Sequence, residues 1–194
     1  LLGRWDQSLA DYLEIRKRSE EAGADYLVLT VDWVTGFIYG DMGEYDLARR
    51  AFESYITSGA ERNPSYKTFY AVFRIYYRGL IDLKQGRLEA ARASLREMKA
   101  LLPDVDPADG EQLIFLMQLH EAEIALAGDS ADAAIAAGRG VKMLNLQNTN
   151  PAMIAGYNVP FLKDVLARAY WKKGELDQAA AEYEKMMIIH PGDR

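Results

Sequence analysis

One pattern recurs along the chain at intervals of 40 to 46 residues. A Gly is followed by a polar residue, then by an aromatic residue or Leu, and then by an acidic residue; a small residue lies five positions after the Gly and a large apolar one nine positions after it. Clear copies begin at Gly3, Gly43, Gly86 and Gly174, and a weaker copy begins at Gly128. Internal repetition at this spacing indicates structural units that stack on one another.

The pattern has a direct physical interpretation. Each Gly is predicted to follow the end of a helix, because a left-handed residue at that place is least strained when it has no Cβ. The acidic residue then falls in the first turn of the next helix, where it meets the positive end of the helix dipole. The small residue allows close approach of two helices, and the large residue one turn later fills the adjoining space. Each copy therefore predicts the turn of a helical hairpin.

The segments between the turns have helical periodicity, and breakers such as Asn63-Pro64 and Leu102-Pro103 separate the hairpins. We predict one all-α domain over residues 1–194, with a half-hairpin at 1–22 and hairpins at about 24–59, 64–101, 109–144 and 159–189. Because the first copy has no helix before it, we expect the chain to be a fragment of a longer protein. The nine expected antiparallel helices cover 4–22, 24–41, 44–59, 64–85, 87–101, 109–127, 130–144, 159–173 and 175–189.

These positions resemble the tetratricopeptide signature, in which a small residue and a Tyr precede the turn Gly and an Ala, an aromatic residue and a Pro follow it. The fourth hairpin fits best, with Ala167, Tyr170, Gly174, Ala179, Tyr183 and Pro191 at the family's spacing. The resemblance implies a right-handed α-α superhelix, a tetratricopeptide-like solenoid, whose first helices line a concave face. It also implies a scaffold that binds proteins or peptides.

The sequence departs from the family in places. Its period exceeds the ~34 residues of the standard repeat, so armadillo-type and transcription-activator helical repeats stay open as alternatives. The third hairpin is degenerate, with Glu121 and Ile124 at signature positions, and Asp82 stands where a Tyr is usual. Residues 168–177 look like the repeat regions of large bacterial regulatory proteins. The alternative function is therefore a sensory or regulatory module that binds an intramolecular segment or a small ligand.

Composition excludes several other classes. The net charge is −6 and the basic residues are interspersed with acidic ones, so we expect no nucleic-acid partner. There is no Cys, and the apolar runs are too short to cross a bilayer, so we expect a cytoplasmic protein without a membrane partner. His120 has no supporting ligands at a suitable spacing, and no catalytic or phosphate-binding motif occurs. We therefore predict no metal, no cofactor and no enzymatic activity.

The aromatic run from Tyr66 to Tyr77 is the main candidate for a binding surface. Most of these side chains are expected to pack between hairpins, but six aromatics in twelve residues exceed one buried stripe, so some should be exposed. The family's clamp for a C-terminal carboxylate is not carried over, because aromatic residues stand at its positions. We expect an extended or helical peptide, with self-association through the solenoid ends as a further alternative. By family spacing, the concave positions are Trp33, Phe37, Phe73, Tyr76, Tyr77, Gln118, Asp164, Arg168 and Trp171, and all of them except Gln118 are predicted to contact a partner.

Overall fold

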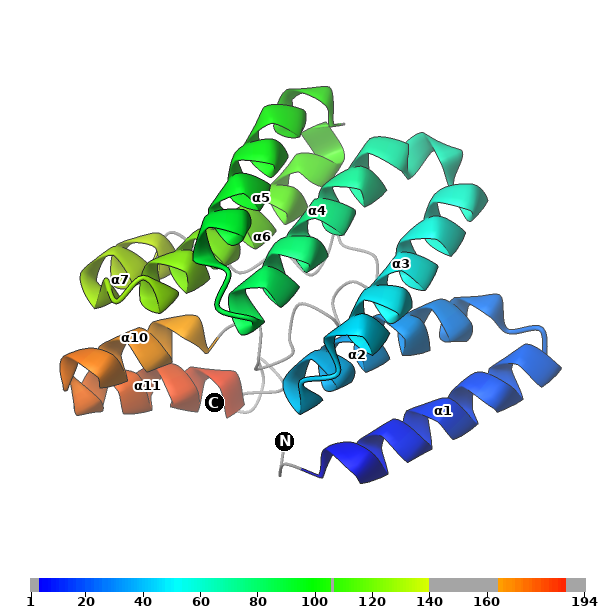
Figure 1. The fold of residues 1–194 in the computed structure, drawn as a ribbon, viewed down its shortest axis with the longest axis horizontal. Coiled ribbons are helices and arrows are strands. Elements are labelled where there is room, and N and C mark those ends of the chain that lie inside the picture. Colours follow the sequence, from blue (N-terminus) through cyan, green and yellow to red (C-terminus); the bar gives the residue numbers. More distant parts are fainter. Residues whose placement is uncertain (1–3, 106, 140–163, 188–194) are drawn as a thin grey trace.

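The computed structural model describes residues 4–105, 107–139 and 164–187. These ranges contain only helices and the turns between them, without a β-strand (Figure 1). Short 3-10 helices at Pro64–Tyr66 and Leu102–Asp104 precede α4 and follow α5. The α-helices are α1 (Trp5–Glu21), α2 (Asp25–Met42), α3 (Tyr45–Arg62), α4 (Lys67–Lys84), α5 (Leu88–Leu101), α6 (Pro107–Ala127), α7 (Ala131–Arg139), α10 (Val165–Lys173) and α11 (Leu176–Met187).

The helices predicted from the sequence are confirmed where the structure describes them. The breakers act as expected, since Pro64 lies in the first turn of the 3-10 helix that leads into α4 and Pro103 lies in the one that ends α5. The predicted helical residues 140–144, 159–163 and 188–189 lie outside the described ranges. None of the described helices combines the length and the apolar character needed to cross a membrane.

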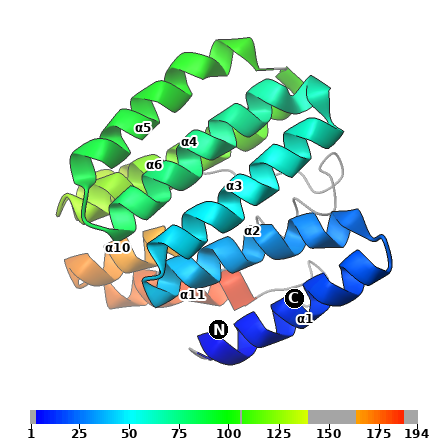
Figure 2. The same ribbon diagram turned by 45° about the vertical axis from the view of Figure 1, so that its right-hand side comes forward.

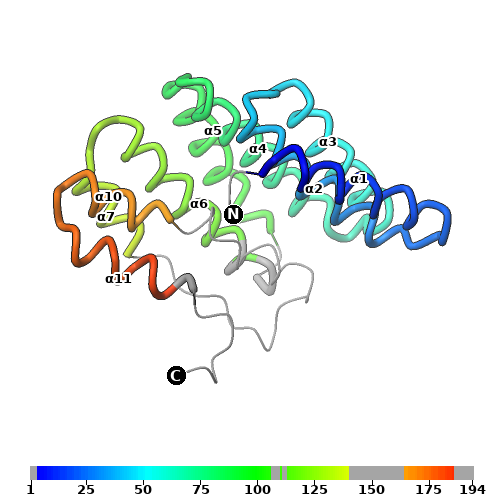
Figure 3. The backbone as a smooth tube through the Cα atoms, turned by 90° about the horizontal axis from the view of Figure 1, so that it is seen from below, coloured from blue at the N-terminus to red at the C-terminus, as the bar shows by residue number. Residues whose placement is uncertain are grey.

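The helices pair in sequence order. The hairpins are α2 with α3, α4 with α5, α6 with α7, and α10 with α11, and the second helix of each packs on the first helix of the next. The first helices also contact one another directly, α4 with α6 and α6 with α10. Figure 2 shows α1 to α5 side by side in chain order, and Figure 3 shows α10 and α11 at the opposite end of the row from α1. We call α2, α4, α6 and α10 the inner row.

A left-handed residue closes each hairpin. Gly43, Gly86 and Gly174 have φ between 72° and 83°. The N–H of Gly43 donates to the carbonyl of Gly40 and the N–H of Glu44 to that of Tyr39, which satisfies the free carbonyls at the end of α2. The same pair of hydrogen bonds recurs at Gly86 and Gly174. The turns predicted at these glycines are therefore confirmed.

The third turn corrects the predicted register. The left-handed residue is Asp129, with φ of 65°, and not Gly128. The N–H groups of Asp129 and Ser130 donate to Leu126 and Ala125, as in the other turns. Asp tolerates the left-handed region better than most residues, so the chain needs no Gly here. With this register the turn residues are spaced 43, 43 and 45 positions apart, and fully buried Ala122 and Ala134 take the small-residue positions.

The small and large residues of the repeat meet as the pattern predicts. A Cβ built on Gly36 would lie 2.5 Å from the ring of Phe52, so the ring occupies the space that a side chain at Gly36 would need. The Phe52 ring in turn stacks on Tyr77 of α4, with ring centroids 4.2 Å apart. The core therefore runs through each hairpin and into the next.

Candidate functional site

The structure buries most of the aromatic side chains predicted to line the concave face. Phe37, Phe73, Tyr76 and Tyr77 are each at most 4% exposed, so the expectation that they are accessible is wrong. Part of the cause is the packing of α2 and α3 against α4, which places Tyr77 against Phe37 of α2 and Phe52 of α3. Rings of this size fill the space between hairpins, and their burial stabilises the stack. Whether these residues contribute to binding stays a prediction.

Trp33 joins this aromatic cluster from α2. It is partly buried, its ring meets Phe37 edge-on at 5.2 Å, and its indole N–H donates to the hydroxyl of Tyr77. The hydrogen bond ties the first helix of one hairpin to the first helix of the next. Buried Phe37 and Tyr77 therefore orient the part of Trp33 that solvent reaches.

The inner row also carries a set of partly buried charges. Lys84 of α4 pairs with Asp41 of α2, and Arg168 of α10 pairs with Glu123 of α6. Arg168 also contacts Asp164, one turn earlier, at 3.0 Å. We call these five side chains the inner-row charges. They comprise three carboxylates and two cations. The helices α2, α4 and α6 each supply one of these side chains, and α10 supplies Arg168, with Asp164 directly before its first residue.

The two interhelical pairs join equivalent positions of consecutive hairpins. Asp41 and Lys84 each stand two residues before a left-handed turn residue, Gly43 and Gly86. Glu123 and Arg168 each stand six residues before theirs, Asp129 and Gly174. The stacking of hairpins brings equal positions together, so a carboxylate and a cation at the same place in successive repeats form a pair.

Burial makes two of the inner-row carboxylates, Glu123 and Asp164, costly to ionise. It raises the pKa of Glu123, although Arg168 acts in the opposite direction. Burial also raises the pKa of Asp164, against the effects of Arg168 and Lys84, while Asp41 adds to the increase. Charges on α2, α4 and α10 thus influence the pKa of one or both of these carboxylates. The arrangement can accept a cationic or hydrogen-bond-donating group.

Of the remaining predicted residues, Trp171 is the most accessible. Its side chain is 61% exposed on α10, one turn after Arg168. The adjacent Lys172 donates to the carbonyl of Leu126 at 3.3 Å and pairs with Asp129, so it binds the end of α6. The structure thus brings Asp164 and Arg168 together and groups Trp33 with the buried aromatics. Trp171 stands exposed one turn after Arg168 on α10.

Sequence reasoning missed Asp41, Lys84 and Glu123. The sequence feature that could have identified them is their constant number of residues from the turn residue. For Glu123 this number matches that of Arg168 only when Asp129, and not Gly128, is taken as the third turn residue. Without that correction, Glu123 and Arg168 do not align. Two surface-type residues on separate helices then give no reason to expect a pair.

Two further polar groups are structural. Asp32 of α2 is buried and accepts from Arg16 of α1 and from the Ser54 hydroxyl of α3, so it links three helices. His120 is also buried, with Nε2 3.3 Å from the carbonyl of Ala91. Within the described ranges, no three His, Asp or Glu side chains are grouped so that they could hold a metal ion.

The architecture is that of an all-α helical repeat protein. The family model described as tetratricopeptide repeat matches residues 76–97 and 164–185. Both matches begin ten residues before a turn Gly, Gly86 and Gly174, and run into the following helix. No curated protein and no solved structure shows significant similarity to the chain.

The chain is a tetratricopeptide-like helical repeat protein. Its fold is the all-α arrangement of stacked helical hairpins that such repeats form. Tetratricopeptide repeats generally mediate protein–protein interactions and act as non-catalytic scaffolds.

Proposed function

We propose that this chain is a protein- or peptide-binding scaffold and that the inner row is its binding surface. The observation that supports the proposal best is the set of inner-row charges. Carboxylates held where burial raises their pKa lower the stability of the isolated chain, and such groups gather at functional sites. A partner that supplies a cation would offset this cost, because it neutralises the surplus negative charge.

The accessible residues suit a peptide anchored by a few strong contacts. Trp33, Arg168 and Trp171 belong to the residue types that most often dominate binding energy. Arg168 is partly exposed and already held by two carboxylates, so little conformational entropy is lost when it contacts a partner. The buried rings of Phe37, Phe73, Tyr76 and Tyr77 keep the helices that carry these residues in place.

The inner-row charges also indicate what the partner brings. Three carboxylates against two cations repel the C-terminal carboxylate of a peptide. A Lys or Arg side chain in an extended or helical segment fits better, because it can approach the carboxylate oxygens of Asp164 and Glu123. We propose no catalytic step for this site.

The test uses peptides selected from a displayed random library against the folded chain. Their affinity is measured by fluorescence polarisation for the parent chain and for a variant that combines Glu123→Gln with Asp164→Asn. We expect at least a tenfold loss of affinity, since the neutral amides keep the shape of the surface but remove its negative charge.

The matched control combines Asp46→Asn with Glu89→Gln. These carboxylates are exposed on the first turns of the second helices α3 and α5, so equal charge is removed away from the inner row. Circular dichroism checks that both variants stay folded. Equal affinity of the selected peptides for both variants would show that the inner row is not the binding surface.

A further inference from the structure

The fourth hairpin, the last of the described helices, exposes three large apolar side chains. Trp171 and Leu176 are 61% and 62% exposed, and Tyr183 is 38% exposed. Figure 3 shows α10 and α11 at the opposite end of the row from α1 and α2. Together with Glu184, which is also exposed, we call these residues the end face.

Each residue of the end face has an equivalent in the first hairpin that contacts the next helix. Leu176 stands two residues after its turn Gly, as Tyr45 does, and Tyr183 stands nine residues after it, as Phe52 does. Trp171 stands three residues before the turn, as Gly40 does. The equivalence rests on the repeat register and not on the exposure of the side chains.

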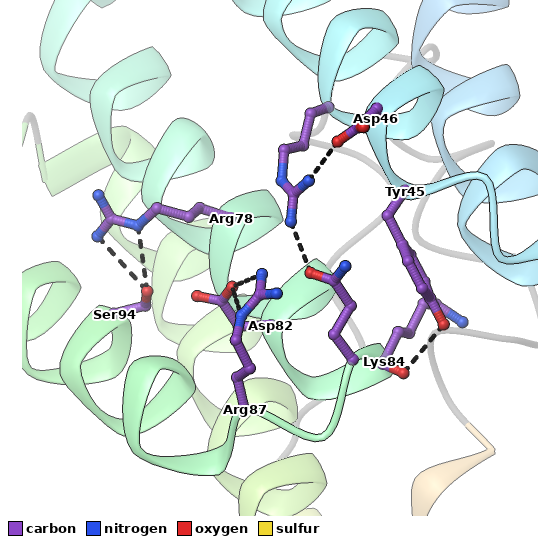
Figure 4. Close-up of polar contacts among 9 residues, drawn as sticks. Tyr45, Asp46, Arg78, Asp82, Lys84, Arg87 and Ser94 are labelled. Atoms are coloured by element: carbon purple, nitrogen blue, oxygen red, sulfur yellow. Dashed lines mark hydrogen bonds and ion pairs between the residues drawn. The ribbon is translucent and has the colours of Figure 1, made fainter.

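In the first hairpin these positions hold the C-terminal half of α4. The Tyr45 hydroxyl donates to the carbonyl of Lys84 at 3.1 Å (Figure 4). A Cβ built on Gly40 would lie 3.5 Å from the aliphatic stem of Lys84, and the Phe52 ring stacks on Tyr77. Leu176 and Tyr183 therefore stand where Tyr45 and Phe52 hold a helix in the first hairpin. Trp171 fills the place of Gly40, so a helix docked on the fourth hairpin packs against the indole ring at that point.

The same junction includes an ion pair. Glu53 of α3 stands ten residues after Gly43, and it accepts two hydrogen bonds from the guanidinium of Arg74, at 2.7 and 3.0 Å. Glu184 stands ten residues after Gly174 and occupies the equivalent position on α11. Arg74 precedes Tyr77 by three residues, so the cation and the aromatic ring lie on one side of α4.

We propose that the end face binds an amphipathic helix of a partner protein, docked on α11 as α4 docks on α3. The partner helix places an aromatic ring over Tyr183 and an Arg or Lys, three residues earlier, against Glu184. The interface continues the contacts between hairpins that already stack this chain, and Glu184 supplies the complementary charge. The inner-row charges take no part in this interface, and Trp171 is the residue that it shares with the surface proposed above. The test variants at Leu176 and Glu184 do not alter that surface, so the two proposals can fail independently.

The chain itself supplies a probe, the acetylated peptide of residues 64–86, which contains α4. Binding is followed by the fluorescence of Trp171, compared with a Trp171→Phe variant to remove the signal of the other tryptophans. We expect saturable binding to the parent chain and at least a tenfold loss for Leu176→Asp. This substitution is at an exposed position, so it leaves the hairpin folded.

Exchanging the charges of the proposed ion pair tests the docking geometry more directly than the loss of an apolar contact does. Affinity is measured by the fluorescence polarisation of a labelled peptide. Glu184→Lys should weaken the peptide at least tenfold, and a peptide carrying Arg74→Glu should recover most of that loss on the Lys variant. The matched protein control is Glu182→Lys, one residue to the other side of Tyr183, where the effect should stay within twofold.

Three results would overturn the proposal. One is the absence of binding by a peptide that circular dichroism shows to be helical. Another is binding that ignores both Leu176→Asp and Glu184→Lys, because the peptide then displaces α4 or binds elsewhere. A third is a concentration-dependent dimer in gel filtration that Leu176→Asp converts to a monomer, since the occupant is then a second copy. The Glu123→Gln, Asp164→Asn variant should bind the peptide as the parent does.

Discussion

His120 of α6 occupies the space beside Gly79 of α4 that a side chain at Gly79 would need. A Cβ built on Gly79 would lie 2.5 Å from Nε2 of His120 and 2.9 Å from Cβ of Ser94. The backbone of α4 thus lies against a residue of the next hairpin and against its own partner helix α5. This contact fixes how closely the second and third hairpins stack.

We expect Gly79→Ala to destabilise the chain by about 1–3 kcal/mol, because the methyl group overpacks this contact. The gain in helix propensity, about 1 kcal/mol, offsets only part of the cost. The control is Gly110→Ala in α6, where a Cβ would meet nothing within 4 Å and should stabilise the chain. Urea denaturation of the two variants should give opposite signs, and equal signs would contradict the packing account.

Burial of His120 predicts an acid-sensitive fold. Burial lowers the pKa of His120 to about 4, although the contact with Ala91 and the charge of Asp82 act in the opposite direction. The unfolded chain binds a proton near pH 6.5, so this group stabilises the fold fully above that pH. The contribution, about 3 kcal/mol, is lost as the pH falls from 6.5 to 4.

NMR titration of the imidazole protons measures this pKa directly, since the chain has only two histidines. His190→Gln assigns the signals without touching the described helices. A midpoint for His120 near 6.5 in the folded chain would contradict the prediction. Nε2 of His120 faces the carbonyl of Ala91, which can only accept, so Nε2 is assigned the proton of the neutral ring; Nδ1 has no hydrogen-bond partner among the described residues.

We predict that replacing Glu123 and replacing Arg168 change the stability of the fold by different amounts. Burial raises the pKa of Glu123 in the folded chain. The folded chain therefore gains stability from this group as the pH falls through the raised pKa, and at higher pH the ionised carboxylate makes the fold less stable. Glu123→Gln should therefore be as stable as the parent at pH 7, or more stable. Arg168→Met leaves two partly buried carboxylates, Glu123 and Asp164, without this cation and should cost about 1–3 kcal/mol.

Thermal denaturation at pH 7 and pH 5 checks both statements. The defect of Arg168→Met should shrink at pH 5, where the carboxylates bind protons, and the variant that adds Glu123→Gln should recover much of the loss. A defect that stays the same at both pH values and in the double variant would show that Arg168 stabilises α10 through packing alone.

The ion pair of Asp32 and Arg16, in the first three helices, should also lose unequal amounts of stability when one partner or the other is replaced. The side chain of Asp32 is 3% exposed and that of Arg16 is 37% exposed. Arg16→Met leaves a buried carboxylate with only the Ser54 hydroxyl and should cost about 2–4 kcal/mol. Asp32→Asn leaves a cation that solvent reaches and should cost about 1 kcal/mol. Guanidinium denaturation would refute this ordering if the Asp32 variant were the less stable one.

The helices could be predicted from the sequence because their signals are local. Gly43, Gly86 and Gly174 mark turns by their own backbone freedom, and the spacing of Ala48 and Phe52 lies within one helix. Neither signal requires knowledge of which helices are neighbours in space. The fold therefore followed from short stretches of sequence read one at a time.

The candidate site could be predicted only in part, because it depends on contacts between hairpins. Whether Tyr77 faces solvent is decided by the ring of Phe52 on another helix, and family spacing does not include that neighbour. Glu123 pairs with Arg168, which lies 45 residues further along the chain. A pattern that shifts by one residue, as in the third hairpin, hides such a pair completely.

Substitutions in the third turn test whether its left-handed residue is Asp129 and not Gly128. Gly128 is not left-handed, and a Cβ there would lie 3.2–3.5 Å from Ile124, Arg92 and Leu88, so Gly128→Ala should change stability by less than about 0.5 kcal/mol. Gly86→Ala, at a true left-handed position, should cost about 1 kcal/mol. Similar losses at both sites would place the turn at Gly128.

Asp129→Gly completes the comparison. Removing the Cβ relieves about 1 kcal/mol of left-handed strain, while the lost ion pair with Lys172 is exposed on the Asp129 side and contributes little. The greater freedom of Gly in the unfolded chain offsets part of the gain, so we expect a net stabilisation of about 0.5 kcal/mol. Asp129→Ala, which keeps the Cβ and removes the carboxylate, should instead lower the melting temperature. If Asp129→Gly destabilised the chain as much as Asp129→Ala does, the contact with Lys172 and not the backbone conformation would determine the residue at this turn.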